Sequence, residues 1–451
     1  FRYAGMAIAN GQTPYLDFFD HKPPLVYFVY RLAHPLGVHG VQVVFTLLTF
    51  LVAIPVYQCC RYWLGRWGVL FTVLWIAMMH DPLVMADGGQ NRQLSALFTS
   101  ALLAYGFRKQ ERPNGWLLGV GASLVFFTQV TDTPALLPFF AWLLFKPGGA
   151  NRKRVLQCIA GFLVPAIVII SWLYVRGAHH AFFYSAFTFN SSWYIDSSYF
   201  AAKTKYVAVL LVKTGYIVPL AAQCLLWRSA FRKQAVVILL CGVVQAVLLV
   251  PGFFFNHYFI AVIPYAFFGW LLLATGFIQQ PNNKFSQWVY GIPVLVGLLI
   301  VFHIKPLHWL NRTPNSFEKR MVEKMEPYAR EVQGRAGQLY SFDQPPFLSL
   351  NATYNITSPS RWLYLHFWLR PGWDTRLDTF KTEVLQQLDK YQCTYIMDRD
   401  NGVLYYHPAL KELWTHYINR EYALIFEEKS ATGKTLFRLL KRKPKPGANV
   451  E

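Results

Sequence analysis

Long apolar stretches separated by short polar connections dominate the first 303 residues of this 451-residue chain. A helix needs about 20 apolar residues to cross the hydrocarbon core of a bilayer. We predict ten crossings, although several stretches are shorter than a straight span and the stretch 135–146, with Pro134 and Pro138 near its start, fits the pattern least. The stretches lie near residues 40–60, 67–80, 93–107, 114–130, 135–146, 155–176, 206–228, 234–250, 258–278 and 287–304.

The pattern changes after residue 304, where no stretch is long enough to span a bilayer and polar residues alternate with β-forming ones. Alternation of this kind is typical of half-buried strands. We predict a small α/β domain whose strand order one sequence does not determine. Its predicted helices are 315–332 and 380–391, and its predicted strands are 337–342, 394–398, 423–427 and 435–440.

The sequence therefore predicts an α-helical polytopic membrane protein with a small C-terminal extracytoplasmic α/β domain. Its parts are a first extracytoplasmic loop with interfacial helices at 1–39, a transmembrane domain at 40–304 and a soluble domain at 305–451. The composition agrees, because only 15% of the residues are charged, against about 25% in soluble globular chains.

Basic residues indicate the orientation, because they concentrate in cytoplasmic loops. When alternate connections are assigned to one side, that side collects Arg61, Arg66, Arg108, Lys109, Arg112, Lys146, Arg152, Lys153, Arg154, Arg228, Arg232, Lys233 and Lys284. Six of the seven acids before residue 304 fall on the other side. We therefore expect the chemistry to be extracytoplasmic. Positive-inside topology and a basic tail also account for the net charge of +20, so we predict no nucleic-acid partner.

The first loop concentrates ionisable residues beside an apolar stretch: Asp17, Asp20, His21 and Lys22. Ionisable side chains at a bilayer boundary are costly and generally functional. Two prolines, Pro23 and Pro24, restrict the backbone directly after Lys22.

Four stretches of this chain resemble the polyprenyl-phosphate-dependent glycosyltransferases of the GT-C superfamily, which include the protein O-mannosyltransferases and the aminoarabinose transferases. The stretches are Arg2-Tyr3-Ala4 with Gly11–Asp17, Asp20–Tyr27 with its His-Lys-Pro-Pro element, Phe187–Asn190 before Tyr194, and His257–Ile260 leading into Pro264. The resemblance implies a GT-C-like fold in a bacterial inner membrane. It also implies transfer of a sugar, with inversion, from a polyprenyl-phosphate donor to a hydroxyl of a protein, lipid or polysaccharide.

The same resemblance places the catalytic aspartate, and one further span, upstream of Phe1. Asp17 and Asp20 are therefore predicted to support the loop or contact substrate, and neither is predicted to be the general base. Lys22 is predicted to bind the departing phosphate, whose negative charge grows in the transition state. The alternative for Lys22 is an interfacial lysine that snorkels.

Three more regions supply predicted contacts. Asn91 and Arg92 precede Gln93, where relatives tend to carry an acid, and Arg92 is predicted either to bind phosphate bidentately or to form a salt bridge. His257 and Tyr258, at the start of a predicted helix, are predicted to contact phosphate or to belong to an interfacial aromatic belt.

In the third region, Asn190 and Tyr194 match a family stretch and are predicted supporting or substrate-binding residues. Tyr194 either stacks on sugar or anchors its loop at the interface.

Metal dependence stays open at this stage. His21 stands where aminoarabinose transferases carry a metal-binding glutamate, and His180 is a candidate second ligand. Zinc requires further donors, which the sequence does not identify. No cofactor other than a divalent metal is expected.

Two other functions fit parts of the sequence. A secondary transporter of an anion would also have many crossings, but transporters place polar groups near the midplane in two related halves, and no internal repeat occurs here. A noncatalytic cell-envelope assembly subunit would fit the departures at His21 and Gln93.

Overall fold

The structure is a computed structural model in which contacts divide the chain into two compact units. The helical unit comprises residues 21–29 and 39–312, and the α/β unit comprises residues 1–20, 30–38 and 313–451. The predicted first loop is thus shared between them. The residues described are 2–80, 89–108, 113–146, 149–150, 152–191, 200–250, 256–279, 316–341, 345–362, 377–398, 408–430, 433 and 435–444.

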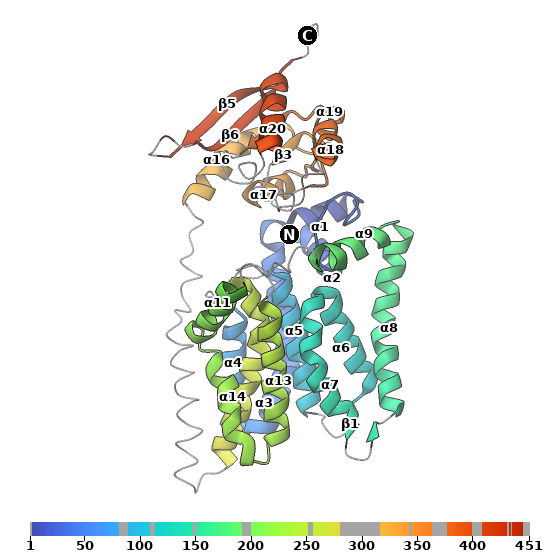
Figure 1. The fold of residues 1–451 in the computed structure, drawn as a ribbon, viewed down its shortest axis with the longest axis vertical. Coiled ribbons are helices and arrows are strands. Elements are labelled where there is room, and N and C mark those ends of the chain that lie inside the picture. Colours follow the sequence, from blue (N-terminus) through green and yellow to red (C-terminus); the bar gives the residue numbers. More distant parts are fainter. Residues whose placement is uncertain are drawn as a thin grey trace. The chain divides into compact units, whose positions relative to one another are not determined.

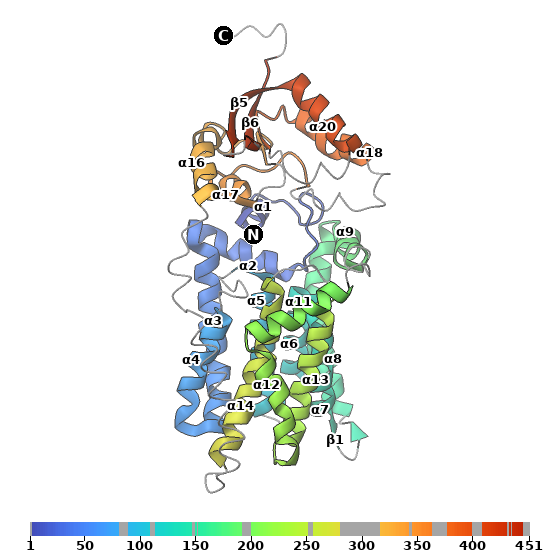
Figure 2. The same cartoon turned by 60° about the vertical axis from the view of Figure 1, so that its left-hand side comes forward.

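The apolar stretches predicted to cross the membrane are largely helical where the structure describes them, although Phe145 and Lys146 form a short strand. The last stretch, 287–304, lies outside the described residues. The main helices run roughly side by side (Figures 1 and 2). They are α3 (Gly40–Leu64), α4 (Gly68–Met79), α5 (Asn91–Arg108), α6 (Gly115–Thr128), α7 (Leu137–Leu144), α8 (Arg152–Val175), α13 (Arg232–Leu249) and α14 (Ile263–Gln279).

Short elements connect these helices. They are α2 (Leu25–Ala33), η1 (His34–His39), η2 (Gly65–Trp67), η4 (Val130–Leu136), the paired β1 (Phe145–Lys146) and β2 (Gly149–Ala150), α9 (His179–Phe183), the π-helix η5 (Tyr184–Phe189), α11 (Phe200–Lys213), α12 (Ile217–Ala221), η7 (Ala222–Arg228) and η8 (Asn256–Val262).

The number of crossings stays a prediction. Among the described residues, four segments are long and apolar enough to cross: Gly40–Met79, Arg152–Val175, Arg232–Leu249 and His257–Ile278. A pair of helices bent by 95° between Lys213 and Ile217 would make a fifth. The apolar helices α6 and α7 are too short to pass this test alone.

The helical unit is layered around α14. The apolar window within His257–Ile278 is entirely buried, whereas only 17% of the window in α8 is buried. Helix α8 instead exposes large apolar side chains such as Ile159, Ile167 and Val168. An extensive exposed apolar surface on long helices is the surface that lipid covers, so this is an integral membrane protein.

Glycines allow the backbones of α6 and α8 to come into direct contact. Gly115 and Gly119 form a G-x-x-x-G pattern on α6, and a Cβ at Gly119 would collide with the carbonyl of Cys158 on α8. Gly161 on α8 meets the backbone of Trp116 in the same way. Small residues at such contacts are characteristic of helix packing in membranes.

The α/β unit contains the four-stranded sheet, in the order β3-β4-β6-β5. Strands β3 (Leu339–Ser341) and β4 (Tyr395–Asp398) are parallel, and the other pairs, which involve β5 (Tyr422–Lys429) and β6 (Thr435–Arg442), are antiparallel. All four predicted strands are confirmed.

The helices of this unit were predicted in part. Both predicted helices occur, as α16 and as the run from α18 to α19, and α1 lies in the first loop, where interfacial helices were predicted without bounds. Helices α17 and α20 were not predicted. The bounds are α1 (Arg2–Ala9), α16 (Ser316–Glu331), α17 (Pro345–Thr353), α18 (Leu377–Phe380), the π-helix η11 (Lys381–Leu385), α19 (Gln386–Lys390) and α20 (Pro408–Glu421).

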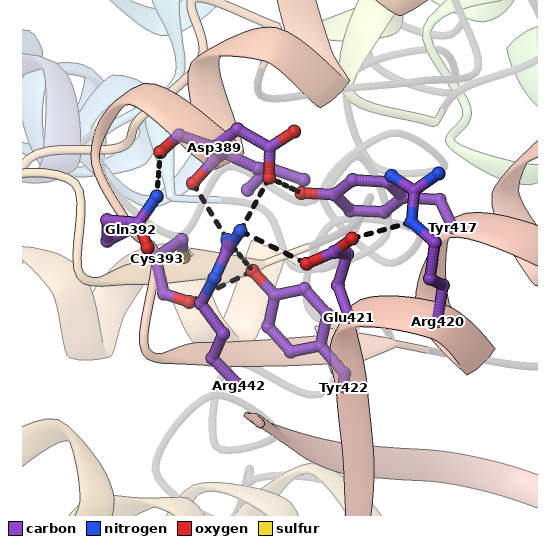
Figure 3. A network of polar contacts seen from close by, with 9 residues as sticks. Asp389, Gln392, Cys393, Tyr417, Arg420, Glu421, Tyr422 and Arg442 are labelled. Atoms are coloured by element: carbon purple, nitrogen blue, oxygen red, sulfur yellow. Dashed lines mark hydrogen bonds and ion pairs between the residues drawn. The ribbon is translucent and has the colours of Figure 1, made fainter. Parts of the chain in front are cut away.

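An arginine network joins the last strand to two helices (Figure 3). Arg442 of β6 pairs with Asp389 at 2.6 Å and donates to the Tyr422 hydroxyl at 3.2 Å. Tyr417 of α20 donates to the same Asp389 carboxylate at 2.9 Å. Burial raises the pKa of the neighbouring Cys393 thiol to about 12, so this thiol is not reactive near neutral pH. The network is structural.

The N-terminal segment packs on residues that lie more than 300 positions later in the chain. Ser358 donates its backbone N–H to the Tyr3 hydroxyl at 2.7 Å, and Asn10 donates to Asn355 at 2.8 Å. Phe19 donates its N–H to the carbonyl of Arg361 at 2.7 Å, and its ring lies 4.5 Å from the Trp362 ring. The first-loop residues before His21 are therefore shaped by the C-terminal part of the chain.

We predict that Gly119→Val will lower the stability of the helical unit by about 1–3 kcal/mol, because the new side chain separates α6 from α8. Thermal unfolding of the detergent-solubilised protein measures this. The control is Gly121→Ala, whose Cβ meets only the flexible end of Leu102. Equal melting temperatures for both variants would contradict the packing described here.

We predict that Trp362→Ala will cost about 3–5 kcal/mol in the α/β unit, because the buried indole packs on Phe19. Hydrogen exchange should also quicken at residues 10–20. Trp67→Ala, at a side chain that is 48% exposed, serves as control. Unchanged exchange at residues 10–20 would show that Trp362 does not hold this segment.

Candidate functional site

A buried ion pair lies within the helical unit. Arg92, in the first turn of α5, is 6% exposed and donates from Nη1 to Oδ1 of Asp132 in η4, which is 2% exposed. Two more donors reach this carboxylate: Ser95 Oγ bonds Oδ2 at 2.7 Å and Gln245 Nε2 of α13 lies 3.3 Å from Oδ1. A buried carboxylate is tolerated when it is both paired and hydrogen-bonded, so three segments are tied together here.

The predicted phosphate ligands come together beside this pair. The Arg92 guanidinium carbon lies 4.6 Å from the centre of the Tyr258 ring, a cation–π contact. The rings of His257 and Tyr258 are 4.7 Å apart at 88°. Arg92 and Lys22 both lie within electrostatic range of the His257 imidazole. We call Lys22, Arg92, His257 and Tyr258 the cationic cluster.

The guanidinium of Arg92 forms a hydrogen bond through one of its nitrogens, and another of its nitrogens has no described acceptor. Nη1 bonds Asp132, whereas the buried Nε has no acceptor within the described part of the chain. Burying an unsatisfied N–H is costly. Of the two alternatives that the sequence left for Arg92, the structure contains the salt bridge.

Lys22 is positioned by contacts to the main chain around it. Asn190 Nδ2 donates to the carbonyl of His21 at 3.2 Å and to that of Ala186 at 2.9 Å. The Tyr27 hydroxyl donates to the carbonyl of Lys22 at 3.3 Å. Asn190 was predicted as a supporting or substrate-binding residue, and its described contacts are to the backbone.

The remaining predicted residues lie elsewhere. Asn91 donates to Gln129 at 2.6 Å, which commits its amide to the protein. Asp17 accepts the Thr13 N–H at 2.6 Å within the α/β unit, as a residue that caps the loop. Asp20 is buried in the same unit. Tyr194 lies outside the described residues.

The described residues do not form a metal site of three or more donors. No group of that size among His, Cys, Asp and Glu occurs in them. His21 contacts the Phe189 ring at 6.1 Å, and the exposed His180 stacks beside His179 at 4.2 Å. Two imidazoles alone do not fit zinc, which takes three or four protein ligands.

Sequence reasoning missed Asp132, Ser95 and Gln245. The signal for Asp132 was present, because an acid directly after an apolar stretch is a candidate for function at a membrane. Its partner Arg92 lies 40 residues earlier, and one sequence does not reveal that pairing. Gln245 sits within an apolar stretch, where a single amide is not distinctive.

Comparison with known proteins identifies the fold. No family model matches the chain, and no curated protein matches it either. The structure of ArnT from Cupriavidus metallidurans bound to undecaprenyl phosphate aligns with a TM-score of 0.59 at 13% identity, over 97% of this chain and 92% of that one. The chain therefore has an ArnT-like fold.

Two archaeal structures are weaker likenesses. They are the Archaeoglobus fulgidus oligosaccharyltransferase in the apo form, and AglB from the same organism in complex with an inhibitory peptide and a dolichol-phosphate. Each aligns with a TM-score of 0.48 at 11% identity, over 97% of this chain and 69% of the other.

We predict that Ser95→Ala will cost about 1–3 kcal/mol, because Asp132 loses a donor in a buried site. The matched control is Ser123→Ala: both serines are fully buried, but Ser123 Oγ has no hydrogen-bond partner in the described residues. Thermal unfolding of the two variants should separate them. Equal losses would mean that the Ser95 hydrogen bond contributes nothing to stability.

Proposed function

We propose that this chain is a membrane glycosyltransferase that moves a sugar from a polyprenyl-phosphate-linked donor to an acceptor hydroxyl. The observation that carries the proposal is the cationic cluster. It brings Lys22 and the ion pair of Arg92 with Asp132 near the side chains of His257 and Tyr258. The ArnT-like fold supports it, since the ArnT structure is bound to undecaprenyl phosphate.

The chemistry needs a cation where the phosphate leaves. As the acceptor oxygen bonds to the anomeric carbon, the bond from that carbon to the phosphate oxygen breaks and its electron pair stays on the phosphate. The acceptor proton passes to a base. Charge thus grows on the phosphate oxygen in the transition state, and an ammonium at Lys22 stabilises it more there than in the ground state.

The remaining roles follow from the contacts. Asn190 and Tyr27 fix the backbone at His21 and Lys22, so that Lys22 is presented from a defined segment. Tyr258 holds the Arg92 guanidinium through its ring. No described carboxylate is assigned as the general base, and no step is assigned to a metal.

The site and the membrane location are proposed as follows. The donor enters from the bilayer, and the cluster and the C-terminal domain are extracytoplasmic in a bacterial inner membrane. The support for this face is the concentration of basic residues in the opposite set of loops. The resemblance of the sequence to inverting GT-C enzymes supports inversion at the anomeric carbon.

We predict that Lys22→Ala will slow transfer at least about 100-fold, as expected when a group that stabilises developing charge is lost. The Tyr27 contact is to the Lys22 carbonyl, so the substitution leaves it in place and the loop should stay folded. Release of polyprenyl phosphate from a panel of polyprenyl-phosphate sugars measures the rate.

The control is Lys233→Ala, which removes an exposed lysine at the start of α13 and should leave the rate unchanged. Full turnover by Lys22→Ala would remove Lys22 from the phosphate site. Failure of the full-length protein without substitutions to use any donor of the panel would refute the proposed function itself.

A further inference from the structure

Asp132 has no assigned role in sugar transfer, yet it is the only carboxylate of the helical unit among the described residues and it accepts from several donors. It accepts from Arg92, Ser95 and Gln245. These donors come from α5 and α13, whereas Asp132 itself lies in η4. The carboxylate is therefore held in one place by two helices that flank it.

The carboxylate fixes the rotation of the guanidinium. A guanidinium presents donors along two usable edges, Nη1–Nη2 and Nε–Nη2, each of which matches an oxyanion. Asp132 takes Nη1, and the Tyr258 ring lies over the guanidinium face. Because Nη1 is bonded and one face is covered by the ring, the plane of the guanidinium has little freedom to rotate.

The other edge is left with an unmet hydrogen bond. Arg92 Nε is buried and has no acceptor in the described part of the chain. The same side chain lies within electrostatic range of His257, as Lys22 does. A buried N–H that has no acceptor among the described residues is suited to an anion that supplies one.

We propose that Asp132 is a positioning residue that turns the Nε edge of Arg92 toward the phosphate of the lipid donor. This inference rests on the proposed function. Asp132 does not touch the donor: it holds Nη1, so that Nε and Nη2 meet two phosphate oxygens. The ion pair of Arg92 with Asp132 has little net charge when no donor is bound. The bound phosphate then adds the acceptor that Nε lacks.

The test is the affinity of the full-length protein for undecaprenyl phosphate in detergent, with undecaprenol as the uncharged comparator. Arg92→Lys is the informative variant, because an ammonium still pairs with Asp132 but offers no second edge. We expect Arg92→Lys to keep a melting temperature close to that of the unaltered chain. We expect its affinity for undecaprenyl phosphate to fall about tenfold or more. Undecaprenol binding should not change.

A double-mutant cycle then separates positioning from a merely structural role. Asp132→Asn alone should lower the affinity for undecaprenyl phosphate. In an Arg92→Gln background it should lower that affinity no further, since there is no guanidinium left to orient. The double variant removes both charges and so avoids an unpaired buried ion, which keeps it foldable.

Three results would overturn the inference. They are an unchanged affinity in Arg92→Lys, a loss from Asp132→Asn that persists in the Arg92→Gln background, and an equal loss of undecaprenol binding. If the unaltered chain binds undecaprenyl phosphate but these variants bind as well as it does, the positioning role fails and the proposed function stands. If the unaltered chain does not bind undecaprenyl phosphate, both fail.

Discussion

The ion pair between Arg92 and Asp132 is the constraint on which the helical unit depends. Neither charge is stable alone in a buried, low-dielectric interior, and removal of one partner from such a pair costs about 3–5 kcal/mol. The two residues must therefore be placed together, and Ser95 and Gln245 complete the bonding of the carboxylate. The sequence of the unit satisfies this by bringing α5, η4 and α13 to one point.

The rest of the cluster is arranged around that point by weaker contacts. Tyr258 covers the guanidinium, and His257 precedes Tyr258 in the same short helix. The segment that carries Lys22 is held by hydrogen bonds to the carbonyls of His21 and Lys22. Two cationic side chains, Lys22 and Arg92, thus lie near the His257 imidazole. This is the electrostatic setting that a phosphate ester requires when its glycosidic bond breaks.

The sequence was informative about elements and much less so about contacts. Apolar stretches locate the helices because burial in lipid constrains every residue of a span, and alternation located β3, β4, β5 and β6 for the same kind of reason. Strand order and the partner of Arg92 depend on residues far apart in sequence, which no local pattern encodes.

Two features of the site illustrate the difference. The first-loop chemistry was recognisable because Lys22 sits in a distinctive local motif. By contrast, α17, which packs on α1 in the α/β unit, carries no periodic signal, and the contact of Phe19 with Trp362 joins positions that only the folded chain brings together. An experiment that removes the C-terminal domain would consequently also strip the first loop of its supports.

The division of the α/β unit between both ends of the chain has a consequence for biosynthesis. Arg2 donates a hydrogen bond to Thr353, which lies 351 positions later. At about 5–20 residues per second the ribosome needs roughly 20–70 s to synthesise the chain between them. During that interval the N-terminal helix has been made, but the residues on which it will rest have not. Translation therefore imposes an order in which this unit is the last to close, and any stop codon before residue 353 leaves its opening segment unfinished.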